Sequence, residues 1–124
     1  MDNVLDTYFK VCSIEVTVQD MAKASAVIAN NGVCPWSGER LIERDIIKTV
    51  RALMCTSGLY DGSGDFSVRV GYPAKSGVGG CILGTVPNKC GIATYGPALN
   101  HKGNSVSGLV IHEKLSAKYD WSLF

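Results

Sequence analysis

The sequence YPAKSGVGGCILGTVPNKCGIATY, residues 72–95, decides the fold, because it contains two apolar segments joined by a turn. Residues 78–86 form a glycine-punctuated apolar run, which is typical of a strand covered on both faces. Pro87-Asn88-Lys89 predicts a turn, and residues 90–95 predict the returning strand. The stretch therefore predicts an antiparallel hairpin whose first strand lies in the middle of a sheet.

A third strand is predicted just before this hairpin. Within residues 66–70, apolar Phe66, Val68 and Val70 alternate with polar side chains, as in a half-buried strand. Because the strand at 78–86 takes the middle position, residues 66–70 are expected to form an exposed edge. Such an edge is open to pairing with another chain or with a further segment.

Two helices are predicted near the start of the chain. Residues 4–12 place apolar side chains one, three and four positions apart, as on one face of a helix. Residues 17–20 fit a capping box, with a threonine at the cap and an aspartate three positions later. Asn30-Asn31-Gly32 ends this second helix, because glycine tolerates the left-handed backbone of a helix stop. Its buried side is expected to contain Val18, Met21, Ala22, Ser25, Ile28 and Ala29.

A third helix and a last helix complete the predicted layout. The third contains the apolar positions of residues 46–54 and stops near Gly58. The last begins at Asn104 or Ser105, after a loop at 97–103. Three helices, three antiparallel strands and one helix predict an α+β fold, with helices packed on a small antiparallel sheet. The length of 124 residues suits one domain.

Composition and charge argue against several classes of function. Hydrophobic residues make up 46% of the chain and charged residues 19%, which favours a compact domain over a disordered one. The net charge of +1 gives no strong field for nucleic acid or for an anionic membrane. No segment approaches the ~20 apolar residues that span a bilayer. The acidic start, Met1-Asp2-Asn3, does not suit a secretory signal.

The cysteines are interpreted as reduced, buried thiols of a cytoplasmic protein. Their number is odd and no C-x-x-C pair occurs. A zinc site is not expected, because His101 and His112 lie near no cysteine pair. We therefore expect no metal and no cofactor. The five cysteines are Cys12, Cys34, Cys55, Cys81 and Cys90.

Two glycine-rich stretches could carry chemistry. In residues 72–80, Lys75-Ser76-Gly77 precedes a strand whose backbone N–H groups could donate to an oxyanion. Glycines that only twist a strand would explain the same pattern. Residues 56–64 form a polar loop in which Tyr60 could relay a proton, although a lone tyrosine more often belongs to a core. Tyr8, taken alone, also fits a core position.

No nucleophile is marked in the sequence. A serine nucleophile of the lactamase type needs S-x-x-K, so that a lysine one helical turn away can take the hydroxyl proton. No serine of the chain is followed by lysine three positions later, and no G-x-S-x-G elbow occurs. A cysteine–histidine pair stays open, but no pattern marks one.

The chain resembles the serine-dependent glutaminases, which share the fold of β-lactamases and penicillin-binding proteins. Lys75-Ser76-Gly77 resembles the K-T-G element of β-lactamases. The resemblance implies that residues 1–124 are the C-terminal portion of a glutaminase-like catalytic domain. That domain would hydrolyse L-glutamine to L-glutamate and ammonia through a γ-glutamyl-serine intermediate. The matching stretches follow family order at residues 5–9, 12–16, 29–32, 34–35, 38–40, 57–61, 63–64, 70–78, 86–88 and 103–105.

The resemblance also implies roles for particular residues. Tyr60 matches the tyrosine that hydrogen-bonds the nucleophile and helps to move its proton. Tyr8 matches a tyrosine lining the substrate pocket, and Val78 matches the residue whose backbone N–H forms half of the oxyanion hole. Lys75, Ser76 and Gly77 are supporting motif residues. The family's S-x-x-K pair has no counterpart here, so we expect the chain to be inactive by itself.

Four interpretations follow from this comparison. The first is a truncated glutaminase, and the second is a subunit completed by a separate chain that docks on the exposed sheet edge and supplies serine and lysine. The third is a non-catalytic binding or assembly module, and family members are usually homo-oligomers. The fourth, a penicillin-binding or lactamase relative, is less favoured, because residues 57–61 and 103–105 match the glutaminases.

Overall fold

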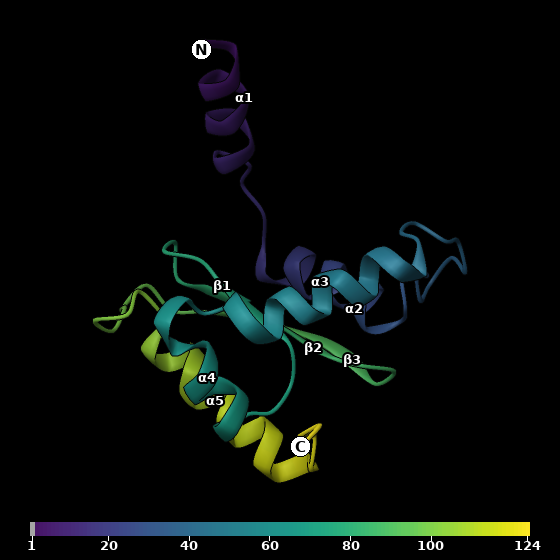
Figure 1. Cartoon of the computed structure of the whole chain (residues 1–124), viewed down its shortest axis with the longest axis vertical. Helices are drawn as coiled ribbons and strands as arrows, with labels where there is room; N and C mark the ends of the chain where they lie inside the picture. Colours follow the sequence, from purple (N-terminus) through teal and green to yellow (C-terminus); the bar gives the residue numbers. More distant parts are fainter. Residues whose placement is uncertain (1) are drawn as a thin grey trace.

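The structure, a computed structural model that describes residues 2–124, is a three-stranded antiparallel sheet packed between helices (Figure 1). The α+β class predicted from the sequence is confirmed. Within residues 2–124, the helices are too short or too polar to span a bilayer. The elements are α1 (Asp2–Cys12), α2 (Val18–Ala29), α3 (Arg44–Ser57), the 3-10 helix η1 (Tyr60–Gly62), α4 (Ser63–Arg69), β1 (Ala74–Ser76), β2 (Cys81–Val86), β3 (Cys90–Tyr95) and α5 (Val106–Tyr119).

The sheet has the order β1-β2-β3, so β2 is central as predicted. β2 pairs with both neighbours in antiparallel register, and all of its residues after Cys81 are buried. The turn at residues 87–89 is confirmed, with Asn88 in the left-handed region at φ 58°. The hairpin predicted from residues 72–95 is therefore correct, although its first strand starts at Cys81 rather than at Val78.

The predicted strand at residues 66–70 is wrong, because this segment lies in helix α4. Phe66 and Val70 are four residues apart and share the buried face of the helix, whereas Val68 is 87% exposed. A five-residue apolar alternation fits either period, and the polar residues of 63–65 extend it as helix. The edge strand is instead the short β1, so the predicted open edge at 66–70 does not exist.

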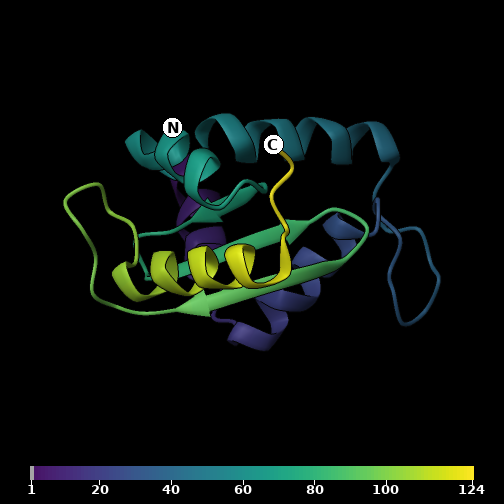
Figure 2. The same ribbon diagram turned by 90° about the horizontal axis from the view of Figure 1, so that it is seen from below.

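Helices α2 and α5 cover opposite faces of the sheet (Figure 2). A Cβ on Gly91 would point into the backbone of α2, whereas a Cβ on Gly84 would meet His112 of α5. Thr85 pairs with Gly91 in the hairpin, so Gly91 and Gly84 lie on opposite sides of the pleat. The sheet is thus the middle layer, and β2 is buried on both faces.

The capping box predicted at the start of α2 is confirmed. The Thr17 side chain accepts from the Asp20 N–H at 3.1 Å, and the Asp20 carboxylate accepts from the Thr17 N–H at 3.0 Å. The helix ends at Ala29, and Gly32 follows at φ 85°, as expected. The predicted buried side is partly wrong, because Val18 is exposed. Met21, Ala22 and Ile28 are half-buried, and the buried residues are Ser25, Val27 and Ala29.

The main core lies between α4, the sheet and α5. Tyr72 packs edge-on against Phe66, with ring centroids 6.0 Å apart, and its hydroxyl lies 2.9 Å from His112 Nδ1. His112 is completely buried. The buried core residues are Leu59, Phe66, Val70, Tyr72, Ala74, Ile82 and Val86.

The other predicted boundaries agree with the structure. Helix α3 ends at Ser57 and is capped by Gly58. Residues 97–103 form a loop, and Ser105 caps α5 by accepting from the Gly108 N–H at 3.2 Å. All five cysteines are free thiols, but the prediction that they are buried holds fully only for Cys34, and Cys12 is exposed.

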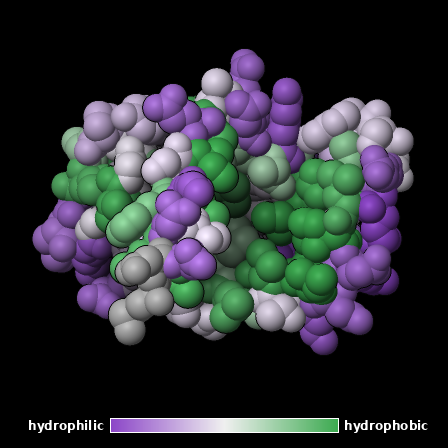
Figure 3. Space-filling model, turned by 90° about the horizontal axis from the view of Figure 1, so that it is seen from above, coloured by the Kyte–Doolittle hydropathy of each residue, from purple (hydrophilic) through white to green (hydrophobic). Residues whose placement is uncertain are grey.

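Helix α1 stands apart from the body of the molecule, to which residues 13–17 connect it (Figure 1). The predicted apolar face exists, but it is exposed. Figure 3 looks down on this end of the molecule and shows hydrophobic side chains on both sides of a hollow. The exposed apolar residues of α1 and the connection, here called the α1 apolar surface, are Val4, Leu5, Tyr8, Phe9, Val11, Ile14 and Val16.

Candidate functional site

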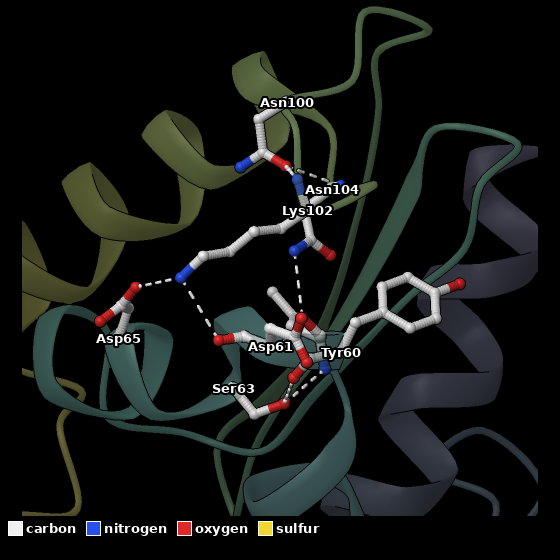
Figure 4. A network of polar contacts seen from close by, with 8 residues as sticks. Tyr60, Asp61, Ser63, Asp65, Asn100, Lys102 and Asn104 are labelled. Carbon is white, nitrogen blue, oxygen red and sulfur yellow. Dashed lines mark hydrogen bonds and ion pairs between the residues drawn. The ribbon is translucent and has the colours of Figure 1, made fainter.

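Tyr60 has a strained backbone and a half-exposed side chain. Its φ of 52° lies in the left-handed region, which costs a residue other than glycine about 1–2 kcal/mol. Its side chain is 46% exposed. The ring points away from the polar contacts that surround the backbone (Figure 4). Strain of this kind persists only where neighbours fix the backbone, and it gathers at functional sites.

Ser63 and Asn104 fix the backbone on which Tyr60 sits. The Ser63 hydroxyl accepts from the Leu59 N–H at 2.9 Å and donates to the Tyr60 carbonyl at 2.8 Å. The Asn104 Nδ2 donates to the Leu59 carbonyl at 3.1 Å. Both polar groups of the residue before Tyr60 are therefore paired with buried side chains (Figure 4).

Strand β1 places Lys75 beside Tyr60. The Lys75 ammonium lies 4.9 Å from the centroid of the Tyr60 ring, a distance at which a cation is attracted by the ring face. The ammonium also donates to the carbonyl of Ser76. Partial burial lowers the pKa of Lys75 from its ordinary value. The structure thus brings together two of the residues singled out from the sequence.

Ser76 and Gly77 occupy structural positions next to this pair. The Ser76 hydroxyl is buried and donates to Asn104 Oδ1 at 2.5 Å. The Gly77 N–H donates to the Cys81 carbonyl at 3.0 Å, which closes the turn from β1 into β2. Both polar groups are therefore used in hydrogen bonds within the fold.

Val78 lies at the tip of this turn and is 71% exposed. Within residues 2–124, its backbone N–H makes no hydrogen bond, whereas the N–H groups of Gly77 and Gly80 are both used. A Cβ on Gly103 would lie 3.7 Å from the Tyr60 ring and 3.9 Å from the Val78 side chain. Tyr60 and Val78 therefore border the same glycine, and the Val78 N–H is free to donate to a ligand.

Tyr8 lies on α1 and is 61% exposed. The Cys12 side chain, one helical turn away, raises the pKa of Tyr8 above its ordinary value, and Tyr60 adds to this effect. The Tyr8 ring lies beside Phe9 of the same helix, with ring centroids 6.1 Å apart, and α1 packs little against the body.

A cavity of about 230 Å³ lies between α4, the 100–104 loop and α5, and Lys102 and Asn104 are among the residues that line it. None of the six predicted site residues lines this cavity. Residues 2–124 contain no group of three or more His, Cys, Asp or Glu side chains that could hold a metal ion.

Sequence reasoning missed Ser63, Lys102 and Asn104 as parts of the site. Lys102 donates to the Asp61 carbonyl at 3.3 Å and pairs with the Asp65 carboxylate at 2.7 Å, so it ties the 100–104 loop to η1 and α4. Ser63 lies in the glycine-rich stretch 56–64, and Ser63 and Asn104 both lie in stretches that match the glutaminases. No signal in the sequence pointed to Lys102.

The arrangement offers a phenol hydroxyl, a nearby ammonium and an unpaired backbone N–H on neighbouring segments. A phenol can relay a proton, and an unpaired backbone N–H can donate to an oxyanion.

The chain belongs to the glutaminase family, because the family model for glutaminase matches residues 1–124. It is 49% identical over 124 residues to glutaminase 2 of Clostridium perfringens, covering 100% of this chain and 41% of the relative. It is 53% identical over 124 residues to a glutaminase of Clostridium tetani, covering 100% of this chain and 40% of that protein. The chain therefore spans about two fifths of the length of these relatives.

Solved structures agree with this assignment. The Bacillus subtilis glutaminase YbgJ, in a covalent complex with 5-oxo-L-norleucine, is similar with a TM-score of 0.94 and 38% identity. The similarity covers 97% of this chain and 43% of that one. The fold of the chain is therefore that of the corresponding part of a glutaminase.

Proposed function

We propose that the chain contributes to a glutaminase that hydrolyses L-glutamine to L-glutamate and ammonia through a serine acyl-enzyme. In this proposal, residues 1–124 are the C-terminal portion of the catalytic domain. The observation that carries it is the strained Tyr60 beside Lys75, with the free Val78 N–H across Gly103. The family match over the whole chain supports the same chemistry.

Each site residue has a role in this proposal. A serine oxygen attacks the γ-amide carbon of glutamine, and Tyr60 carries the serine proton towards the departing ammonia. The Val78 N–H donates to the oxyanion that forms on the amide oxygen. Tyr8 lines the substrate pocket, and Lys75 supports the electrostatics around Tyr60. Water then cleaves the acyl-serine ester and releases L-glutamate.

In this proposal the serine nucleophile comes from polypeptide outside these 124 residues, because the chain contains no S-x-x-K. Removing the nucleophile of a comparable serine hydrolase costs on the order of a millionfold in rate. The chain is therefore proposed to be inactive by itself. The α1 apolar surface supports docking of the missing portion, since large exposed apolar patches mark interaction sites. A cytoplasmic location, which suits the five free thiols, belongs to the same proposal.

Complementation with a relative tests this proposal. We would mix the purified chain with the part of Clostridium perfringens glutaminase 2 that lies outside the matched region, and measure ammonia released from L-glutamine. We expect no activity from either part alone and activity from the mixture. Tyr60→Phe should lower the activity of the mixture by about a hundredfold or more, because the proton relay is lost.

Tyr119→Phe is the matched control, because Tyr119 is 49% exposed and lies in the last turn of α5. It should leave the activity of the mixture unchanged. Glutaminase activity of the chain alone would overturn the proposal that the serine comes from elsewhere. A stable complex without activity would contradict the proposed catalytic function itself.

A non-catalytic assembly module is the second candidate, and the α1 apolar surface also favours it. In that case the chain would bury this surface against a second copy of itself. Sedimentation of the chain, alone and with the complementing part of the relative, distinguishes the two candidate functions. A homo-oligomer that does not dissociate when the complementing part is added would support the assembly module.

A further inference from the structure

Asn104 is a buried amide that links three segments of the chain. Only 1% of it is exposed. Its Nδ2 donates to the Leu59 carbonyl at 3.1 Å, and its Oδ1 accepts from the Ser76 hydroxyl at 2.5 Å. Its backbone N–H donates to Asn100 Oδ1 at 3.0 Å, which holds it in the loop (Figure 4). One side chain therefore joins the residue before Tyr60 to strand β1.

The contacts of Asn104 require an amide. The Leu59 carbonyl can only accept a hydrogen bond, and the Ser76 hydroxyl donates to Asn104, so the bridging side chain must offer a donor and an acceptor at once. A carboxylate would face the Leu59 carbonyl with a second acceptor. An alanine would remove both of these hydrogen bonds. The Leu59 carbonyl would keep only the Gly62 N–H at 2.9 Å, and the Ser76 hydroxyl would keep only the Gly58 carbonyl at 3.5 Å.

The same loop contacts Tyr60 from two other directions. Lys102 donates to the carbonyl of Asp61, the residue after Tyr60. Gly103 has a φ of 80°, and a Cβ on it would lie 3.7 Å from the edge of the Tyr60 ring. Groups on residues 102–104 therefore contact the chain before, after and beside Tyr60, in addition to the two hydrogen bonds of the Ser63 hydroxyl.

We propose that Asn104 is a positioning residue, which holds the Tyr60 side chain beside the segment that contains Lys75 and Val78. The placement of Tyr60 by Asn104 does not depend on the proposed function, whereas the use of Tyr60 as a proton relay does. Asn104 is buried and acts through Leu59 and Ser76, so it does not itself touch the substrate. Without it, the strained backbone of Tyr60 relaxes and the phenol moves away from the Val78 N–H.

Fluorine NMR of the whole chain tests this placement without any need for activity. The five tyrosines would be replaced by 3-fluorotyrosine, and Tyr60→Phe would assign the Tyr60 resonance. In Asn104→Ala we expect this resonance to move towards its position in the unfolded chain or to split. The other four tyrosine resonances should stay in place. Ser76→Ala removes only one of the two Asn104 contacts, so it should cause a smaller change in the same direction.

Asn31→Ala is the matched control. The Asn31 side chain also donates one hydrogen bond, to Asn88, and accepts one, from Arg51, in another part of the fold. It should leave the Tyr60 resonance unchanged. An unchanged Tyr60 resonance in folded Asn104→Ala would overturn the inference, and so would a joint shift of all five resonances. If Asn104→Ala fails to fold, Ser76→Ala and Asn104→Asp take its place, because each keeps one of the two hydrogen bonds of Asn104. The inference then requires that the Tyr60 resonance shifts in these variants and that the other four tyrosine resonances do not.

Kinetics of the complemented enzyme separate this inference from the proposed function. Asn104→Ala should lower kcat by tenfold or more and change KM far less, because substrate contacts remain. Suppose that the Tyr60 resonance shifts in Asn104→Ala, but the mixture made with the unsubstituted chain has no activity. This result would reject the proposed function and keep Asn104 as the residue that positions Tyr60. Full kcat in Asn104→Ala would reject the positioning role while the glutaminase function stands.

Discussion

At the scale of single residues, His112 is held as a neutral imidazole in the core. Its Nε2 lies 3.3 Å from the Ile82 carbonyl, which can only accept, so Nε2 carries the proton. Nδ1 then accepts from the Tyr72 hydroxyl at 2.9 Å. Burial lowers the pKa of His112 to about 4, because water no longer stabilises the imidazolium.

This lowered pKa predicts a loss of stability in mild acid. The unfolded chain binds a proton to this histidine near pH 6.5, whereas the folded chain does so only near pH 4. The free energy of unfolding should therefore fall as the pH drops through this window, by about 3 kcal/mol in total. Urea unfolding from pH 7.5 to 4 measures it.

His112→Gln is the control, because glutamine keeps a donor and an acceptor but does not titrate. Its free energy of unfolding should depend less on pH between 6.5 and 4 than that of the unchanged chain. Parallel curves for the two proteins would show that His112 is not the source of the acid sensitivity.

At the scale of elements, α2 packs onto β3 with backbone almost in contact with backbone. A Cβ on Gly91 would lie 2.1 Å from the Ala26 nitrogen, an atom of the helix backbone that cannot turn aside. Ser25 fills the same interface and donates to the Gly84 carbonyl at 2.5 Å. Small residues therefore set the spacing between this helix and the sheet.

Gly91→Ala should destabilise the fold, because α2 must move away from β3 to admit a methyl group. We expect a loss of about 1–3 kcal/mol in the free energy of unfolding, as for an overpacked core. Gly64→Ala is the comparison, since nothing lies within 4 Å of a Cβ there and Gly64 is in helix α4. It should raise stability by about 0.5–1 kcal/mol. Equal melting temperatures for the two variants would contradict this account.

Patterns within one element were predictable from the sequence, and contacts between distant segments were not. The capping box and the turn at 87–89 depend on neighbouring residues, so both were predicted. Arg51 was missed, although it caps the end of α2 by donating to the carbonyls of Ile28 and Ala29. Asn104 was missed for the same reason, because its partners Leu59 and Ser76 lie far away in the chain.

The candidate site shows the same division. Tyr60 and Lys75 were recognised through their motifs, and the structure brings them together. The reason for their placement, a strained backbone fixed by Ser63 and Asn104, could not be derived from spacing. The pattern of residues 66–70 predicts a strand where the structure has helix α4, because five residues cannot separate the two periods and only packing against the core decides between them.

At the scale of the whole molecule, the α1 apolar surface is the largest departure from a self-contained domain. Apolar residues on α1 and residues 13–17 are exposed, and the chain spans about two fifths of the length of its relatives. A helix of this kind gains little stability from its own residues, because most helices depend on tertiary packing. We therefore expect α1 to be the least stable helix of the isolated chain.

Replacing Leu5 and Phe9 by glutamate tests whether this surface binds other polypeptide. The double variant should lose the ability to form the complex with the glutaminase part used for complementation, as measured by sedimentation. Its melting temperature should change little, because both residues are exposed in the isolated chain. Val68→Glu is the control, since Val68 is 87% exposed on α4. Complex formation by the Leu5/Phe9 variant as tight as that of the control would contradict the assignment of this surface.

The packing of α2 on the hairpin has a consequence for synthesis on the ribosome. Ser25 and its partner Gly84 are 59 residues apart, and the segment between them includes Tyr60. Contacts over such distances form only after a long loop has closed, which slows folding. Until the hairpin has left the exit tunnel, α2 has no sheet to rest on, and Ser76 and Asn104 cannot meet. We therefore expect Tyr60 to reach its strained conformation late, after nearly the whole chain has been translated.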